Sequence, residues 1–265
     1  LTNCSKKIDD HQTHQLTAEH ERQIGQSIDN ALIEHFDQTA SKNVLSAIDY
    51  PAIYNYINNC VLGLHQSDYY KDFKEDHPLA NSAPIIRVLQ DSGNTGAFTA
   101  PSGYIYLYTD LLRAVDSDAQ FMAILSLLII CSAYKYDLNK LEHHFSRNFL
   151  FDLALGLNLN NAPAPRNGTD LHAVLEQLED HPYQIHRVEK ADCDVEPILC
   201  ELDYDLRSYS AFYQNNQHLQ WLSLFPRAMD ANSYSNHLYY LHNNDPGCDG
   251  QTIVGDYQSF KLLLP

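Results

Sequence analysis

The sequence predicts an α+β domain that is dominated by helix, with a small sheet and a central apolar helix. From Phe121 to Ala133 the chain carries no charge, although polar residues flank it on both sides, which is typical of a buried helix. Residues 103–109, GYIYLYT, alternate with the period of a strand. Helical patterns precede and follow the strand patterns, and this order of elements indicates the α+β class.

The chain before the sheet predicts two helices. Residues 17–36 predict the first, with Thr17 as its N-cap and with Glu21 and Arg22 in its first turns. The second is expected over residues 52–64. A strand, IIRVLQ, is then expected over residues 85–90.

Two more extended segments complete the predicted sheet. In NTGAFTAPSG, glycine and proline mark turns around a short extended piece. In the strand that follows, alternation places side chains on two faces. Tyr104, Tyr106 and Tyr108 are expected on one face, and Ile105 and Leu107 on the other.

Helices are expected to make up most of the rest of the chain. Ser117 and Gln120 form a candidate capping box for the apolar helix. Pro197 is expected to break or kink a later helix near Asp194, and the tail after Asn243 looks irregular. The other expected segments are a helical turn at 110–115, helical sequence to about Leu155, a loop at 158–169, and helices over 171–178, from Ile185 to about Asp194, and over 208–225.

Size and charge limit the classes of function. The chain has 265 residues, of which 44% are hydrophobic, and this is enough for one large domain with a core of its own or for two small ones. Asp and Glu number 34 against 17 Lys and Arg, so the net charge is −17. That charge opposes binding to nucleic acid and docking on an anionic membrane surface. No apolar run reaches the roughly 18 residues that would span a bilayer.

The start of the chain, LTNCSKK, is similar to the end of a bacterial lipoprotein signal. Cys4 would then be the lipidated residue, although Asn3 departs from the small residue usual before it. We therefore divide the chain into a polar tether, 1–16, and a single domain, 17–265. This interpretation places the protein in the bacterial envelope or periplasm, where that lipid would be its only membrane contact. The alternative is an ordinary cysteine.

The cysteines do not form a zinc-ribbon pattern, because the sequence contains no CxxC pair. Cys193 and Cys200 lie seven residues apart. On one continuous helix they would be about 10 Å apart along the axis, too far for a disulfide. Cys131 falls in the apolar helix, which predicts a buried thiol.

Four features in series carry a resemblance to a known family. They are EHERQIG at 19–25, GAFTAPSGYIYLYTDLL at 96–112, the apolar helix, and Ala191–Asp192 followed by Tyr204–Asp205. The chain thereby resembles the gluzincin metallopeptidases of the HtpX, Oma and BepA type over residues 17–217. The resemblance implies a zincin-like domain.

The same alignment implies that the zinc site has been lost and that the HExxH motif is degenerate. Leu127 stands for the first histidine ligand, Leu128 for the general-base glutamate, Cys131 for the second histidine and Val188 for the glutamate ligand. Catalytic zinc needs about three protein ligands and a water that a neighbouring base deprotonates. Glu189 is adjacent to Val188, but one residue turns a helix by about 100°. We therefore expect a pseudopeptidase without a metal cofactor.

A peptide groove is the part of the family's site that could remain. The resemblance places Gly96, Ala97 and Phe98 on an edge strand and Asp192 beside the groove, and makes His237 the remnant of a late His-Pro segment. An edge strand can pair with an extended peptide through its backbone. A peptide or an envelope protein is the expected partner, and a role in binding or assembly the expected function.

Two other hypotheses remain open. The chain could be a hydrolase with a relocated site, either non-zinc or with an atypical metal, in which Cys131 is a nucleophile or Glu189, Asp192 and His237 act together. A metal could also bind elsewhere. Its candidate ligands are His11, His14 and His20 near the start and His143 and His144 on a helix, whereas NGT at Asn167 is interpreted as a loop.

Overall fold

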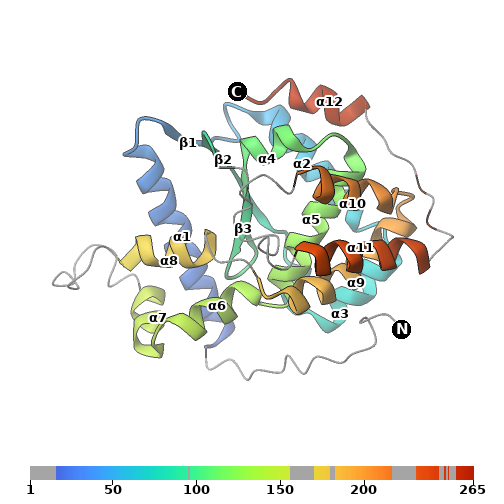
Figure 1. Cartoon of the computed structure of the whole chain (residues 1–265). Coiled ribbons are helices and arrows are strands. Elements are labelled where there is room, and N and C mark those ends of the chain that lie inside the picture. Colours follow the sequence, from blue (N-terminus) through green and yellow to red (C-terminus); the bar gives the residue numbers. More distant parts are fainter. Residues whose placement is uncertain are drawn as a thin grey trace.

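The computed structural model describes residues 16–94, 96–155, 170–179, 183–216, 231–244 and 255–265, together with Cys248 and Gly250. The chain is mostly helical and contains a four-stranded mixed sheet, which agrees with the predicted α+β class. Helices cover both sides of the sheet (Figure 1). The predictions for Cys4, His11, His14, Asn167 and residues 217–225 lie outside the described residues.

The sheet has the strand order β1-β2-β4-β3. β2 and β4 are parallel, whereas β1 pairs antiparallel with β2, and β3 pairs antiparallel with β4. β3 is therefore an edge strand. The bounds are Lys42–Leu45 for β1, Ile85–Asp91 for β2, Ala97–Ala100 for β3 and Tyr104–Tyr108 for β4.

The two faces of the sheet pack into two hydrophobic clusters. The tyrosines of β4 lie in one cluster with side chains of α1, α6, α7 and α8, and Ile105 and Leu107 lie in the other with α2, α5, α9, α10 and α11. The predicted alternation of β4 is confirmed. These helices span Ala18–Asp37 (α1), Pro51–Leu64 (α2), Asp118–Ala133 (α5), Tyr136–His144 (α6), Arg147–Ala154 (α7), Asp170–Glu179 (α8), Ile185–Glu201 (α9), Leu206–Asn215 (α10) and Ala231–Asn244 (α11).

α1 begins as the sequence predicts and lies very close to the sheet. The Thr17 side chain caps the helix by accepting a hydrogen bond from the backbone N–H of His20. A Cβ on Gly25 would lie 2.1 Å from the carbonyl oxygen of Pro101, so only glycine fits where α1 meets the turn between β3 and β4. Arg87 of β2 pairs with the buried Asp29 of α1 at 2.7 Å.

The apolar helix α5 is buried at every position. Ser117 caps it as predicted, but the Gln120 side chain accepts from Asp116 N, so the capping box is incomplete. The predicted run of helix to Leu155 is divided in three, because Lys135 adopts a left-handed conformation (φ 56°) and Ser146 caps α7. Within the described residues, no single helix is both long and apolar enough to cross a membrane, whereas α5 and α6 together satisfy both requirements but are bent by 53°.

The expected end of α9 near Asp194 is wrong. The helix continues through Pro197 to Glu201. Proline removes one backbone donor, but Ile198 and Leu199 are buried just beyond it and keep the last turn packed. The loss of one hydrogen bond is therefore outweighed by burial of apolar side chains.

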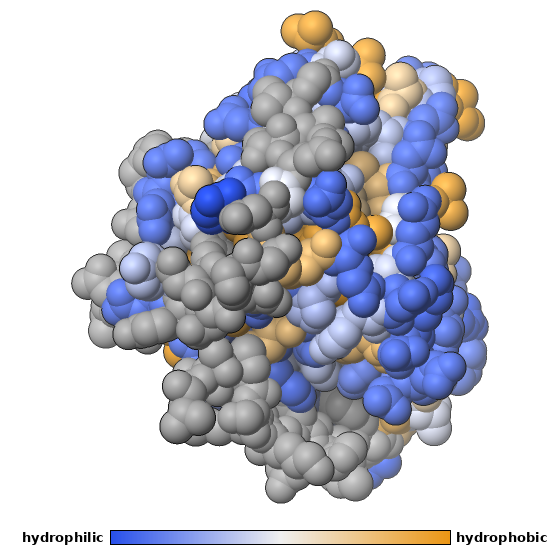
Figure 2. Space-filling view, turned by 90° about the vertical axis from the view of Figure 1, so that its right-hand side faces the viewer, coloured by the Kyte–Doolittle hydropathy of each residue, from blue (hydrophilic) through white to orange (hydrophobic). Residues whose placement is uncertain are grey.

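The tail also contains a helix that the sequence did not indicate. In α12, Gly255–Lys261, the buried Tyr257 and Phe260 anchor the chain, and Leu262 beyond it is 88% exposed. Figure 2 shows a mainly hydrophilic face with apolar side chains at the top of the molecule, at the height of α12 in Figure 1. The other elements not foreseen are β1, α11, α3 (Asp68–Asp76) and the 3-10 helix η2 (Pro78–Asn81), whereas α4 (Thr109–Ala114) was expected.

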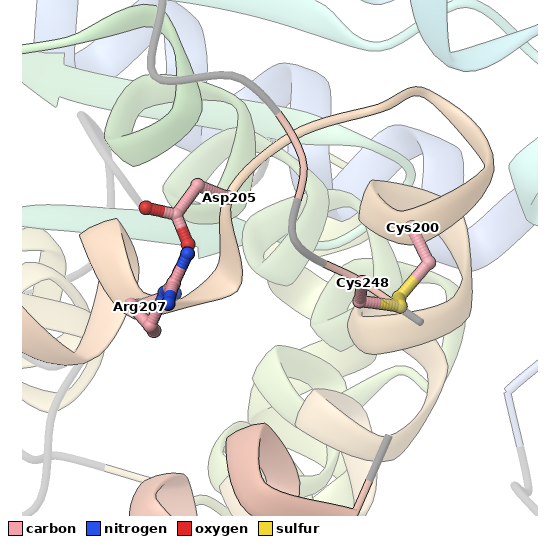
Figure 3. Close-up of a disulfide and its surroundings, with 4 residues drawn as sticks. All are labelled: Cys200, Asp205, Arg207 and Cys248. Atoms are coloured by element: carbon pink, nitrogen blue, oxygen red, sulfur yellow. A yellow bond between two sulfur atoms is a disulfide. The ribbon is translucent and has the colours of Figure 1, made fainter. Parts of the chain in front are cut away.

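A disulfide between Cys200 and Cys248 joins the end of α9 to the chain that follows α11 (Figure 3). Cys193 and Cys200 lie on one continuous helix, and this is the arrangement that keeps them too far apart for a disulfide. Beside the disulfide, Asp205 caps α10 and pairs with Arg207 at 3.0 Å. Cys60 and Cys131 are free thiols.

Candidate functional site

The four positions aligned with the zinc ligands and the general base lie in one hydrophobic core. Leu127, Leu128 and Cys131 on α5 and Val188 on α9 are all fully buried. α5 and α9 pack against each other, so these positions belong to adjacent helices. These positions contribute to the apolar packing of the core, because Leu and Val have no lone pair to offer a metal.

Cys131 lies in surroundings that suppress thiol chemistry. Complete burial raises the pKa of the Cys131 thiol well above its usual value, and the charge of Asp192 acts in the same direction. A nucleophilic cysteine reacts as the thiolate and needs partial exposure. The geometry therefore favours a structural role for this thiol.

Asp192 and His237 come together, although 45 residues separate them in the sequence. The buried Asp192 accepts a hydrogen bond from Tyr209 Oη at 3.2 Å, and Tyr209 Oη lies 2.8 Å from Tyr234 Oη. His237 Nε2 is 3.5 Å from Asp192 Oδ2, which is ion-pair distance when the ring is protonated. Burial lowers the pKa of His237, but the interaction with Asp192 and the charges of Glu189 and Glu196 outweigh it, so the net pKa is raised. These polar contacts thus link α9, α10 and α11 inside the core.

The other candidate ligands do not join this group. Glu189 is half-buried beside the fully buried Val188, His20 caps α1, and His143 and His144 are exposed at the end of α6. Among the residues that the structure describes, no group of three or more His, Cys, Asp or Glu side chains could hold a metal ion.

The residues of the expected peptide groove are buried. Gly96, Ala97 and Phe98 are inaccessible, and Phe98 stacks on Tyr106 with ring centroids 4.6 Å apart. α8 packs against β3, and Glu179 of α8 accepts a hydrogen bond from Tyr108 at 3.1 Å. All four residues of β3 are buried, so a peptide could pair with this strand only after the surrounding structure opens.

A second buried polar cluster lies between α6 and β3, and the sequence did not reveal it. Burial raises the pKa of Asp137 to about 7 and lowers the pKa of Lys140 to about 7. Lys140 Nζ lies 3.9 Å from the centre of the Tyr183 ring, and Tyr183 Oη is 2.6 Å from Thr99 Oγ1. In YDLNK these residues look like an ordinary exposed helical turn, and only the preceding apolar helix hints at their burial.

Comparison with models of protein families found no match, and no curated protein matches the chain.

Proposed function

We propose that this protein is a catalytically inactive, zincin-like relative of the metallopeptidases, and that it acts in the bacterial envelope by binding another molecule. The observation that carries the proposal is the burial of Leu127, Leu128, Cys131 and Val188 in one apolar core on two adjacent helices. A single thiol among aliphatic side chains does not meet the requirement for about three ligands and a water.

The arrangement around these positions supports the resemblance. The glycine of the first motif, Gly25, lies where α1 approaches the β3–β4 turn, and a side chain there would clash with Pro101. β3 is an edge strand antiparallel to its neighbour. Asp192 on α9 faces His237 from a late helix. These features keep the order that the metallopeptidase resemblance implies, with the zinc ligands replaced.

The cysteine chemistry and the charge support an envelope location and a protein or peptide partner. The disulfide of Cys200 and Cys248 is of a kind that persists in oxidising compartments such as the periplasm. A net charge of −17 repels phosphate backbones and anionic headgroups. We therefore propose a peptide or an envelope protein as partner.

The first test is the metal content of the purified protein, measured by elemental mass spectrometry, together with thermal melts in the presence and absence of a strong chelator. We expect no stoichiometric zinc and the same melting temperature with chelator, because no zinc contributes to folding. One zinc per chain and a melt lowered by chelator would refute the proposed loss of the site.

The second candidate is a hydrolase with a relocated site, and the buried Asp137 and the half-buried Lys140 of α6 favour it. An acid and a base with pKa values near 7 are suited to proton transfer at neutral pH. A peptidase and esterase screen tests it, with Asp137→Asn and Cys131→Ala as variants. Turnover that resists chelation and is abolished by either substitution would favour the hydrolase over the binding protein.

A further inference from the structure

A pocket of about 640 Å³ opens at the end of α5 that is remote from Cys131. Its Met122 precedes Cys131 by nine residues, which is about 14 Å along a helix axis. The volume falls within the roughly 300–1,000 Å³ typical of small-molecule sites. Its walls come from α2, the start of α5, the turn between α9 and α10, and α12.

The lining combines aromatic rings with carboxylates. Tyr56, Tyr204 and Phe260 contribute the rings, and Asp118 and Asp256 the carboxylates. Tyr56 stacks on Phe260 with ring centroids 4.3 Å apart. Among the described residues that line the pocket, there is no lysine, arginine or histidine. The described wall is therefore negative and aromatic, with no cation of its own.

The carboxylate of Asp118 is fixed in place. Tyr56 Oη donates a hydrogen bond to Asp118 Oδ1, and the backbone N–H of Tyr257 donates to Oδ2 at 3.3 Å. Burial raises the pKa of Asp118, and the charge of Asp256 adds to the rise. Both carboxylates line the same pocket, so a cation bound there would be attracted to each of them.

We propose that this pocket binds an organic amine in its ammonium form, with the charged group toward Asp118 and Asp256 and an apolar body against the aromatic rings. An ammonium is attracted both to a carboxylate and to the face of an aromatic ring. The net charge of −17 also attracts cations to the protein as a whole. An anionic ligand of the same shape is excluded by the same charges.

Three probes of similar size separate charge from shape: phenethylammonium, phenethyl alcohol and phenylpropionate. Isothermal titration of the intact chain should show binding of the ammonium probe with a Kd below about 1 mM, and weaker or no binding of the other two. Added salt should weaken the binding, since the exposed Asp256 contributes to it. Alcohol binding as tight as ammonium binding, or no binding of any probe, would overturn the proposal.

Matched variants test whether the Asp256 carboxylate and the Tyr204 ring contribute to binding of the ammonium probe. Asp256→Asn should weaken ammonium binding about three- to fivefold, and Tyr204→Leu by a similar factor. The control is Asp37→Asn, which removes the same charge from an exposed position on α1, on the other side of the sheet. A loss of affinity in the control equal to that in Asp256→Asn would show only a response to net charge and would contradict the proposal.

The free thiol of Cys60 reports whether a probe occupies this pocket. Cys60 lines it and is half-buried, whereas the other free thiol, Cys131, is fully buried. Burial raises the pKa of Cys60 to about 12, so alkylation is slow and is followed over a long incubation at neutral pH, where the probe keeps its charge. We expect phenethylammonium to slow the alkylation of Cys60, measured by mass spectrometry, with half-protection at the Kd. Binding without protection would place the ligand elsewhere and refute the assignment.

Discussion

At the scale of single residues, the position that the motif resemblance aligns with the first histidine ligand carries a leucine. Leu127 is completely buried on α5, so its methyl groups contribute by burial and packing. Leu127→Ala should lower the free energy of unfolding by about 2–5 kcal/mol, because it removes buried groups and leaves a cavity. Chemical denaturation measures the change. The control, Leu62→Ala at a side chain 62% exposed, should cost less than about 0.5 kcal/mol.

The contact between His237 and Asp192 should make stability depend on pH. The net pKa of His237 is raised in the folded protein, so its contribution is fully present below the pKa of an unfolded histidine and is lost as pH rises through the folded pKa. His237→Gln should therefore destabilise the protein more at about pH 6 than at about pH 9. Unfolding curves of both proteins across this range measure the difference. An equal loss at both ends would indicate that packing, and not charge, sets the role of His237.

At the scale of elements, the end of α9 depends on long-range contacts as well as on its own sequence. Pro197 takes one hydrogen bond from the last turns, and Cys200 at the end of the helix is fixed by its disulfide. Ser67 and the backbone N–H of Tyr69 also donate to Glu201, at 2.7 and 2.9 Å. These contacts hold a helix end that local propensity alone would not extend.

The double variant Cys200→Ser/Cys248→Ser tests the contribution of the disulfide. The bond closes a loop with a sequence separation of 48, and in the chain-entropy model its loss should cost about 4 kcal/mol of unfolding free energy. Cys60→Ser is the control, because Cys60 is a free thiol. If the double variant is no less stable than this control, the end of α9 is held by its packing alone.

The elements that the sequence predicted are those with a strong local signal. Thr17 and Ser117 mark helix starts through capping chemistry, and the alternation of Tyr104–Tyr108 identifies both faces of a strand. The misplaced boundaries arise where tertiary contacts prevail, as at Pro197. α12 was missed because its short sequence is stabilised by the burial of Tyr257 and Phe260 against a distant helix.

In the candidate sites too, burial could be predicted from the local sequence, whereas contacts between distant segments could not. The burial of Leu127 and Leu128 follows from their place in an uncharged segment. The meeting of Asp192 and His237 was indicated only through the motif resemblance. Nothing in the sequence brings Asp118 near Asp256, because α5 and α12 meet only in the folded chain.

At the scale of the whole molecule, several contributions favour the folded state at mildly acidic pH. The net charge of −17 becomes smaller as pH approaches the isoelectric point near 5.0, and this reduces self-repulsion. Asp137 keeps its proton to about pH 7 in the folded protein but loses it near pH 4 when unfolded, so its contribution falls as pH rises between these values. His237 acts in the same direction. His65 and His77 oppose it, since burial lowers their pKa values.

We expect the unfolding free energy to rise by on the order of 1–3 kcal/mol from about pH 7 to about pH 5.5, because the shift of Asp137 alone corresponds to roughly 1.4 kcal/mol per pH unit. Denaturant unfolding of dilute protein at each pH measures it. Asp137→Asn should reduce this slope, since an amide does not titrate, whereas Asp37→Asn removes an exposed charge and should preserve it. A slope that Asp137→Asn leaves unchanged would assign the pH dependence to the overall charge, and a fall in stability on acidification would show that His65 and His77 prevail over Asp137.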